Sequence, residues 1–219
     1  MYVELKNINK NFGDYKASDN VNFGVEKGKL IGLLGPSGSG KTTILRMIAG
    51  LETPDSGDII IDGVRVNDLA ASKRGIGFVF QNYALFPTMT VTENIGIAMK
   101  KSGDEKKKEI DRLLEQFALQ NLGGRMPNEL SGGQQQRVAI ARAIAAKPPL
   151  ILADEPTGNL DSHSGKDVMK IIHHLHSEGR TIILITHDNG IAAEAQRVIR
   201  IQDGKIIDDY FNKNFCEEE

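Results

Sequence analysis

The sequence has almost no net charge and a single cysteine, and each shortage excludes a class of protein. Lys and Arg number 27 against 29 Asp and Glu, which leaves a net charge of −2. No basic field therefore covers the chain, and we expect no nucleic-acid partner. The one cysteine, Cys216, cannot close an intramolecular disulfide, which fits a reducing compartment such as the cytoplasm.

Long hydrophobic runs are missing as well. The longest, such as LIGLL, PPLILA and TIILIT, fall far short of the roughly 20 residues that a membrane-spanning helix needs. The chain starts with the alternating, polar segment MYVELKNINKNF, so we expect no export signal. With 219 residues, of which 40% are hydrophobic, the chain is long enough to bury the core of one domain.

Apolar strand patterns alternate with helical patterns along the chain. Helices are predicted over 41–50, over 164–179, and through the mainly helical stretch 90–146. Apolar strands separated by helices are typical of a parallel sheet covered on both faces, so we expect an α/β core with 90–146 as a helical insert. Strands are predicted over 2–8, 21–25, 29–34, 57–63, 75–80, 149–154 and 181–186, the first two as edge strands, with a closing hairpin over 198–207 that turns at Asp203–Gly204.

A glycine-rich loop follows the strand predicted over 29–34. Its sequence GPSGSGKTT matches the pattern GxxxxGK[ST] in the strand–loop–helix context that the pattern requires. Glycines let backbone N–H groups surround phosphate oxygens, and the next helix directs the positive end of its dipole at the same charge. We expect Lys41 to bridge the outer phosphates of a nucleotide and the Thr42 hydroxyl to ligate Mg²⁺. The predicted phosphate-binding residues are Gly35, Pro36, Ser37, Gly38, Ser39, Gly40, Lys41, Thr42 and Thr43.

Polar side chains follow two other predicted strands. The buried run LILADE ends in Asp154 and Glu155, and TIILIT is followed by His187. Ligands of open α/β sheets gather at the carboxyl ends of the strands, so we expect these three side chains near the phosphates. Asp154 is the predicted Mg²⁺ partner through water, Glu155 polarises the attacking water, and His187 reaches the γ-phosphate.

A second phosphate-binding surface is predicted in LSGGQQQRVAIARA, residues 130–143. Ser131 can cap the helix that follows, and Gly132 with Gly133 allow close approach by an anion at the helix N-terminus. One nucleotide already has its phosphates in the first loop. We infer that the second surface closes over a nucleotide held by another copy of the chain.

In these residues the chain resembles the ATP-binding subunits of ABC transporters, and the resemblance covers nearly all of it. GPSGSGKTT is similar to their Walker A motif, LSGGQ to their signature, and ILADEP to their Walker B motif with its catalytic glutamate. Gln81 in VFQNYALFP resembles the Q-loop glutamine, Asp161 in GNLDS the D-loop aspartate, and His187 the switch histidine. Because the signature is not a general P-loop feature, the resemblance disfavours kinases and GTPases.

The resemblance implies an enzyme that hydrolyses ATP to ADP and phosphate with Mg²⁺, in a single domain over 1–219. The implied fold is α/β, a P-loop NTPase (RecA-like) core with a mainly parallel sheet, an N-terminal antiparallel β-subdomain and an inserted α-helical subdomain at about 90–146. Two copies are expected to pair head to tail, with each ATP between the Walker A of one and the signature of the other. The signature residues implied to bind nucleotide are Ser131, Gly132, Gly133 and Gln134.

The same resemblance assigns the remaining roles. The implied catalytic residues are Glu155, His187, Gln81, Lys41 and Asp161, and the implied Mg²⁺ ligands are Thr42, Gln81 and Asp154. Phe12 aligns best with the aromatic residue that stacks on adenine, and Tyr15 is a near competitor.

Transmembrane partner subunits are expected to dock near Phe80–Thr90, where Tyr83, Leu85 and Phe86 are the exposed candidates. That docking would place the chain peripherally on the inner face of the cell membrane. FQNYALFPTMTVTENI is similar to sulfate, polyamine and sugar importer ATPases, whereas LSGGQQQRVAIARA and ADEPTGNLDSHSG resemble the lipoprotein-release and macrolide-export group, which the length and the D-loop favour slightly. The alternative is a non-transport ABC ATPase that regulates a membrane partner, as in cell division.

Overall fold

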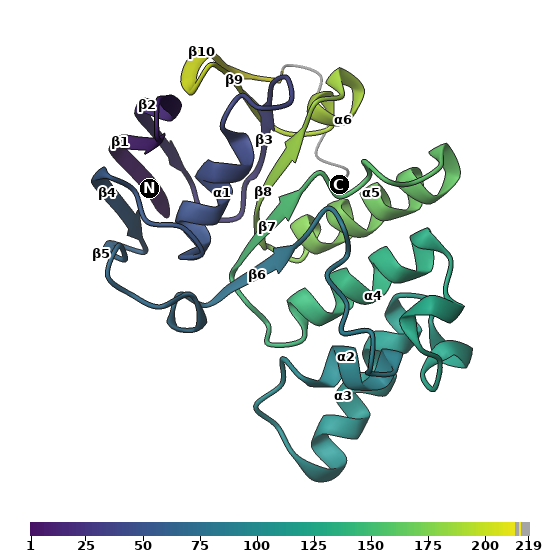
Figure 1. Ribbon diagram of the computed structural model, residues 1–219. Helices are drawn as coiled ribbons and strands as arrows, with labels where there is room; N and C mark the ends of the chain where they lie inside the picture. Colours follow the sequence, from purple (N-terminus) through teal and green to yellow (C-terminus); the bar gives the residue numbers. More distant parts are fainter. Residues whose placement is uncertain (213–214, 216–219) are drawn as a thin grey trace.

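A large, mainly parallel sheet forms the centre of the molecule in the computed structural model, which describes residues 1–212 and residue 215 (Figure 1). Its six strands lie in the order β10-β9-β3-β8-β7-β6. They are β3 (Leu30–Leu34), β6 (Ile76–Val79), β7 (Leu150–Asp154), β8 (Thr181–Thr186), β9 (Arg197–Gln202) and β10 (Lys205–Phe211). All neighbouring pairs are parallel except β10 with β9, so the predicted mainly parallel sheet is confirmed.

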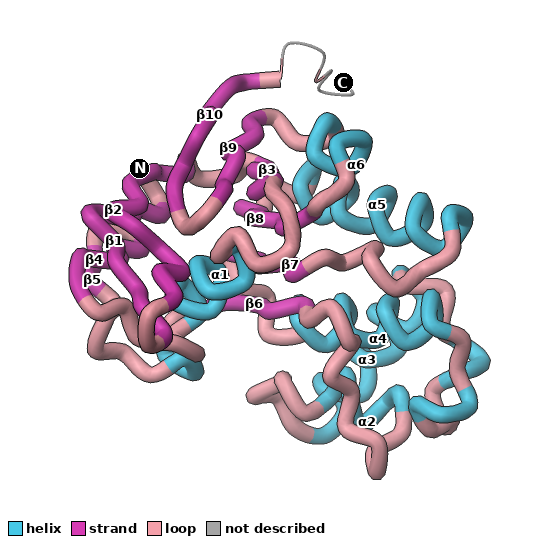
Figure 2. The backbone as a smooth tube through the Cα atoms, turned by 45° about the horizontal axis from the view of Figure 1, so that its top comes forward, coloured by secondary structure: helices cyan, strands magenta, loops and turns pink. Residues whose placement is uncertain are grey.

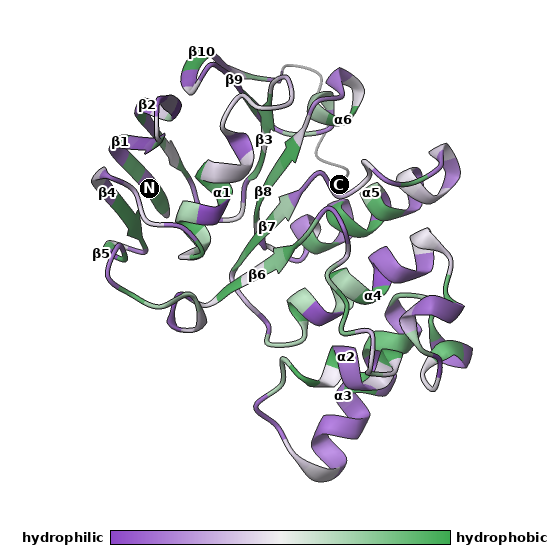
Figure 3. Cartoon of the chain, in the orientation of Figure 1, coloured by the Kyte–Doolittle hydropathy of each residue, from purple (hydrophilic) through white to green (hydrophobic). Residues whose placement is uncertain are grey.

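The central strands are buried on both faces. Every residue of β3, β7 and β8 is buried, which explains why these strands are continuous apolar runs (Figure 3). Ile31 packs into one core with α1 (Lys41–Ala49), whereas Leu30 packs into another with α4 (Gly132–Ile144) and α5 (Ser162–Ser177). Figures 1 and 2 show α1 on one side of the sheet and α4 and α5 on the other.

The N-terminal strands form a second, antiparallel sheet in the order β2-β1-β4-β5. They are β1 (Val3–Phe12), β2 (Tyr15–Val25), β4 (Ser56–Ile61) and β5 (Val64–Arg65). The prediction that the first strand is an edge strand is wrong, because β1 lies between β2 and β4. Its alternating pattern reflects one buried face, which inner strands of antiparallel sheets also have. Both strands also run further than predicted, to a hairpin where Phe12 pairs with Tyr15.

Helices fill the chain between β6 and β7. They are α2 (Val91–Gly96), α3 (Gly103–Gln116) and α4, with 3₁₀ turns at Gln120–Leu122 and Pro127–Glu129. A further 3₁₀ turn, at Ala71–Lys73, precedes β6. Figure 1 shows α2 and α3 beyond α4, away from the sheet. Thr90 caps α2 in a capping box with Glu93, and Ser131 caps α4 with Gln134, which confirms the predicted cap at Ser131.

The last strands form the predicted hairpin. Asp203 and Gly204 have φ of 49° and 74°, the left-handed conformation that a tight two-residue turn requires. A short helix, α6 (Asn189–Ala193), precedes this hairpin and was not predicted. Within the described part of the chain, no helix is long and apolar enough to cross a membrane. Cys216, expected to make no disulfide, lies outside the described residues.

Candidate active site

The predicted phosphate loop connects β3 to α1, and neighbouring backbone surrounds it. A Cβ atom added to Gly35 would lie 2.0 Å from the carbonyl oxygen of Ile201, and one added to Gly40 would lie 2.0 Å from that of Ala17. Gly40 also has a φ of 96°, which only glycine adopts readily. Only glycine therefore fits at either end of the loop.

Lys41 points back into the loop. Its Nζ donates to the carbonyl oxygens of Gly35 and Pro36, both at 2.8 Å, and to Ser39 Oγ at 3.3 Å. The side chain is almost fully buried, and burial lowers the pKa of its ammonium, although the nearby acidic groups act in the opposite direction. Among the described residues no carboxylate is in hydrogen-bond contact with this buried cation, which is therefore well placed to receive an anion.

Thr42 and Asp154 meet beside this loop. The Thr42 hydroxyl donates to Asp154 Oδ1 at 2.9 Å, although the two residues are 112 positions apart. Asp154 ends β7 and is buried; burial raises the pKa of its carboxyl, and the hydrogen bond from Thr42 lowers it. The pair presents a hydroxyl and a carboxylate oxygen at the carboxyl edge of the sheet.

Glu155 brings the other predicted catalytic groups together. Its Oε2 lies 3.2 Å from Nδ1 of His187, which follows β8, and 3.3 Å from Nε2 of Gln81, which follows β6. The Glu155 backbone has a φ of 45°, a strained conformation for this residue type. Three strand ends thus supply one cluster, as the topology of the sheet predicts.

Asp161 has a different position. It caps α5, where its carboxylate accepts hydrogen bonds from the backbone N–H groups of His163 and Ser164 and from the Ser164 hydroxyl. The backbone bond from Ser164 contributes most to lowering the pKa of Asp161. Among the described residues, none of its hydrogen bonds reaches Glu155.

The signature segment begins α4 and is tightly packed. A Cβ atom added to Gly132 would lie 2.9 Å from the Tyr83 hydroxyl, and one added to Gly133 would lie 2.8 Å from the Ser164 hydroxyl. Ser131 accepts from Gln134 N at 3.3 Å, and the Gln134 side chain accepts from Ser131 N at 2.9 Å. Because α4 and α1 cover opposite faces of the sheet, the two predicted phosphate sites are separate within one chain.

The two candidate adenine-stacking rings lie at the β1–β2 hairpin. Phe12 and Tyr15 are 47% and 48% exposed, so part of each ring is accessible to a ligand. The Tyr15 hydroxyl donates to the carbonyl oxygen of Gly38 in the phosphate loop, whereas the Phe12 ring lies 5.1 Å from Lys10 Nζ. Tyr15 therefore has the direct contact with the loop.

The segment Phe80–Thr90, predicted as a docking surface, is held by residues that sequence reasoning missed. Arg142 on α4 donates to the carbonyl oxygens of Ala84 and Tyr83 at 2.6 Å and 3.0 Å. Buried Asn94 donates to the carbonyl oxygens of Phe86, Met89 and Thr90 and accepts from Phe86 N. These partners are main-chain groups, which leave no signal in a sequence pattern.

The exposure of this segment differs from the prediction. Phe86 is 44% exposed, as expected, and the Arg142 guanidinium lies 5.7 Å from its ring. Tyr83 and Leu85 are half-buried, because the Tyr83 hydroxyl donates to Asn159 O and Leu85 packs against the helical core. Of the three candidates, only Phe86 is exposed.

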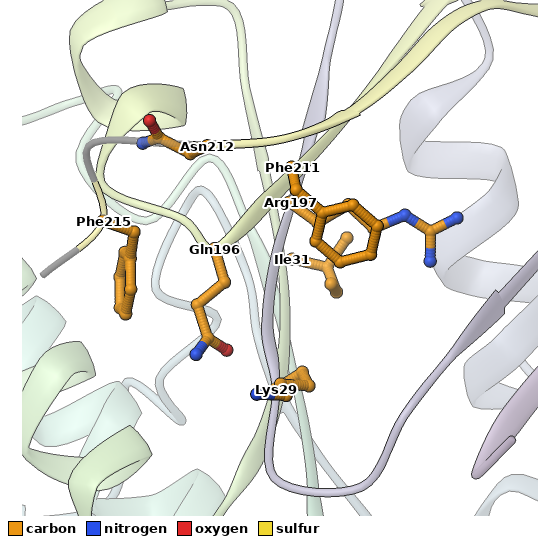
Figure 4. A pocket seen from close by; sticks show the side chains of 7 residues that line it. All are labelled: Lys29, Ile31, Gln196, Arg197, Phe211, Asn212 and Phe215. Atoms are coloured by element: carbon orange, nitrogen blue, oxygen red, sulfur yellow. The ribbon is translucent and has the colours of Figure 1, made fainter. Parts of the chain in front are cut away.

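A cavity of about 410 Å³ lies elsewhere, between β3, β9 and the end of β10 (Figure 4). Ile31, Phe211 and Phe215 line it, together with Arg197, whose guanidinium is paired with Asp209 at 2.6 Å. None of its lining residues belongs to the predicted site, so the cavity is separate from the cluster at Glu155.

Comparison with known proteins identifies the family. The ABC transporter family matches residues 18–158, more than half of the chain. The chain belongs to the ABC transporter family. It is an ATP-binding, ATP-hydrolysing cassette of that family, and the predicted P-loop fold and enzyme class are confirmed.

Three relatives illustrate the match. A probable sulfate/thiosulfate import ATP-binding protein of Chlorella vulgaris is 46% identical over 212 residues, which cover 94% of this chain and 90% of that protein. A macrolide export ATP-binding/permease protein of Mannheimia succiniciproducens is 44% identical over 94% of this chain; the chain spans only 34% of that protein. A dimeric post-hydrolysis structure of the ATP-binding cassette MJ0796, bound to ADP and Pi, has a TM-score of 0.88 at 38% identity and covers 97% of this chain and 100% of its own. The mixed resemblance to importers and exporters is thus confirmed.

Proposed function

We propose that the chain is the motor subunit of a membrane transporter and that two copies close head to tail around two ATP molecules. The observation that supports this most directly is the convergence of Glu155, Gln81 and His187 at the same sheet edge as Lys41 and the Thr42–Asp154 pair. Phosphoryl transfer is mainly positioning and charge neutralisation. It needs a cation on the phosphates and a group that orients water, and this edge has both.

Nucleotide binding is proposed to involve the whole loop. Backbone N–H groups of Gly35–Thr43 surround the phosphates, and Lys41 exchanges its contacts with loop carbonyls for contacts with the outer phosphate oxygens. At the hairpin, the contact between Tyr15 and Gly38 favours Tyr15 as the ring that stacks on adenine, with Phe12 beside it.

The Thr42–Asp154 pair fits Mg²⁺. This ion keeps several water and phosphate ligands and takes only one or two oxygens from protein. Within the described residues, no group of three or more His, Cys, Asp and Glu side chains forms an all-protein metal site. The Thr42 hydroxyl, Asp154 directly or through water, and the Gln81 amide oxygen are the proposed ligands. When bound, Mg²⁺ neutralises charge on the phosphates.

Hydrolysis is assigned to Glu155 and its neighbours. The Glu155 carboxylate orients the attacking water and draws its proton, while His187 and Gln81 hold the carboxylate and face the γ-phosphate. Asp161 acts less directly. By holding Ser164 at the start of α5, it shapes the surface against which Gly133 packs.

The partners follow from the two separate phosphate sites. Ser131, Gly132, Gly133 and Gln134 of one copy contact the γ-phosphate of ATP bound to the other, which explains why α1 and α4 are on opposite faces of the sheet. Transmembrane subunits dock at Phe80–Thr90, so the chain works on the inner face of the cell membrane. An importer protein and an exporter protein each match 94% of the chain, so the proposed ATPase and membrane partner suit either direction of transport.

A Glu155→Gln variant tests the proposal. It should bind ATP normally, lose hydrolysis by roughly 10²- to 10⁴-fold, and accumulate as an ATP-bound dimer in size-exclusion chromatography. Glu178→Gln, at the exposed end of α5, is the matched control and should behave as wild type. A Glu155→Gln protein with wild-type turnover would remove Glu155 from the mechanism.

A further inference from the structure

Gln136 is a buried polar side chain for which the chemistry above has no use. It lies in α4 and has no exposed surface. Its Nε2 donates to the carbonyl oxygen of Pro156 at 2.7 Å, and its Oε1 has no hydrogen-bond partner among the described protein groups. A buried amide oxygen without a partner is costly. The hydrogen bond to Pro156 is the interaction that a glutamine at this position provides, which suggests that this bond has a function.

Pro156 directly follows the catalytic glutamate. Glu155 has a φ of 45°, and the tight turn that begins with it closes through a hydrogen bond from Gly158 N to Glu155 O at 3.0 Å. A strained backbone of this kind persists only where its surroundings hold it. The Gln136 amide provides such a restraint, because it fixes the peptide group between Pro156 and Thr157 from a different element of the fold.

The restraint comes from the helix that begins with the signature. Gln136 lies five residues after Ser131, or about 7.5 Å along the helix axis at 1.5 Å per residue. A shift of α4 as a rigid body therefore moves both the surface that faces the partner's nucleotide and the anchor of this chain's own Glu155 turn.

We propose that Gln136 is a positioning residue that couples the orientation of Glu155 to the position of α4. When Ser131–Gln134 contact ATP bound to the other copy, α4 takes its closed position. Gln136 then fixes the position of the Pro156 carbonyl group, and this fixes the orientation of the Glu155 carboxylate. Each chain's hydrolytic group is thus aligned by contact with its partner's nucleotide. This inference rests on the head-to-tail dimer of the proposed function.

Gln136→Met removes the donor while keeping the length and the helix preference of the side chain. Steady-state ATPase measurements on the full chain should show kcat lowered by roughly 10- to 100-fold, because misplacing a catalytic group by about 1 Å has an effect of this size. The KM for ATP should stay within about twofold, since no nucleotide contact is removed.

The matched control is Gln135→Met. Gln135 is the next residue of α4, and its Nε2 also donates to a main-chain carbonyl, that of Leu130 at 3.2 Å, but not to the Glu155 turn. This variant should keep a wild-type kcat. An equal loss of kcat in both variants would indicate a general weakening of α4 and would overturn the proposal.

A double variant separates positioning from stability. In a Glu155→Gln background, adding Gln136→Met should leave the residual single-turnover rate unchanged, because Gln136 acts through the carboxylate that is already gone. A further loss of the same size as in the wild-type background would contradict the proposal. If Gln136→Met does not fold, Gln136→Asn keeps an amide that is one methylene too short to reach Pro156, and the same two outcomes apply.

The outcomes also distinguish this inference from the proposed function. A wild-type chain that does not hydrolyse ATP contradicts the proposed function itself. A wild-type chain that hydrolyses ATP, beside a Gln136→Met chain with an unchanged kcat, contradicts only the role of Gln136.

Discussion

His187 Nδ1 lies 3.2 Å from Glu155 Oε2, although the two residues follow different strands. In the proposed mechanism this contact holds the carboxylate beside the attacking water, so His187→Ala should lower kcat by roughly 10²-fold or more and change the KM for ATP little. Steady-state ATPase kinetics check this. His174→Ala, an exposed histidine of α5, is the control. A His187→Ala enzyme with wild-type kcat would make the contact incidental.

Arg142 should stabilise the segment Phe80–Thr90, the proposed docking surface, because its guanidinium donates hydrogen bonds to the carbonyl oxygens of both Tyr83 and Ala84. Lysine keeps the charge but has no planar fork, so Arg142→Lys should lose one of these bonds. A hydrogen bond to a charged group is worth about 2 kcal/mol, which corresponds to a Tm lower by roughly 4–8 °C in a chain of this size.

Hydrogen exchange locates the effect of Arg142→Lys. Amide exchange should accelerate within 82–90 and remain unchanged in β3 and β8. Arg112→Lys, on the half-exposed face of α3, is the control and should alter neither Tm nor exchange in 82–90. Unchanged exchange in 82–90 in the Arg142→Lys chain would show that the segment does not depend on the second hydrogen bond of Arg142.

The parts of the site that could be predicted from sequence are those whose chemistry lies in a short local pattern. Lys41 and Thr42 follow from a loop of fixed spacing, and Asp154 and Glu155 from acids that end an apolar strand. Because parallel strands place their carboxyl ends at one edge, the meeting of these groups with His187 follows from the order of elements.

The parts that could not be predicted depend on main-chain partners far along the sequence. Arg142 binds a carbonyl 58 positions away and Gln136 one 20 positions away, and neither partner depends on side-chain type. In an amphipathic helix both read as ordinary polar positions. The placement of β1 inside its sheet was missed for a related reason, because alternation reports one buried face and not the number of neighbouring strands.

His176 should make the fold sensitive to acid. Its ring nitrogen Nε2 contacts the Gly28 carbonyl oxygen at 2.9 Å, and burial lowers the pKa of His176, with the hydrogen bond to Gly28 opposing that shift. The unfolded chain then binds the proton more readily than the folded one, near the ordinary value of about 6.5. The contribution of neutral His176 to the free energy of unfolding is therefore fully present above that pH. It is lost as the pH falls through the lower pKa that His176 has in the folded chain.

Thermal unfolding between pH 7.5 and pH 5 measures this effect. His176→Gln retains a donor for Gly28 without a titrating ring, so its Tm should fall less steeply with decreasing pH than that of the wild type. His174→Gln, exposed on the same helix, should follow the wild-type curve. Parallel curves for His176→Gln and wild type would place the acid sensitivity in other groups.

Complementation between two inactive variants tests the shared active site. Lys41→Ala should lose ATP binding. Ser131→Arg should bind ATP but fail to close on a partner, because a large side chain replaces the α4 N-cap that the proposed dimer places beside the partner's nucleotide. In a mixed head-to-tail dimer, the intact loop of the Ser131→Arg chain faces the intact signature of the Lys41→Ala chain, so one of the two sites is complete. Mixing the two proteins should therefore restore ATPase activity, up to about a quarter of the wild-type rate if the chains pair at random, dimer formation is complete and the sites act independently. A mixture as inactive as its components would mean that the two halves of the site do not come from different chains, and activity in either variant alone would mean that the substituted residue is not essential.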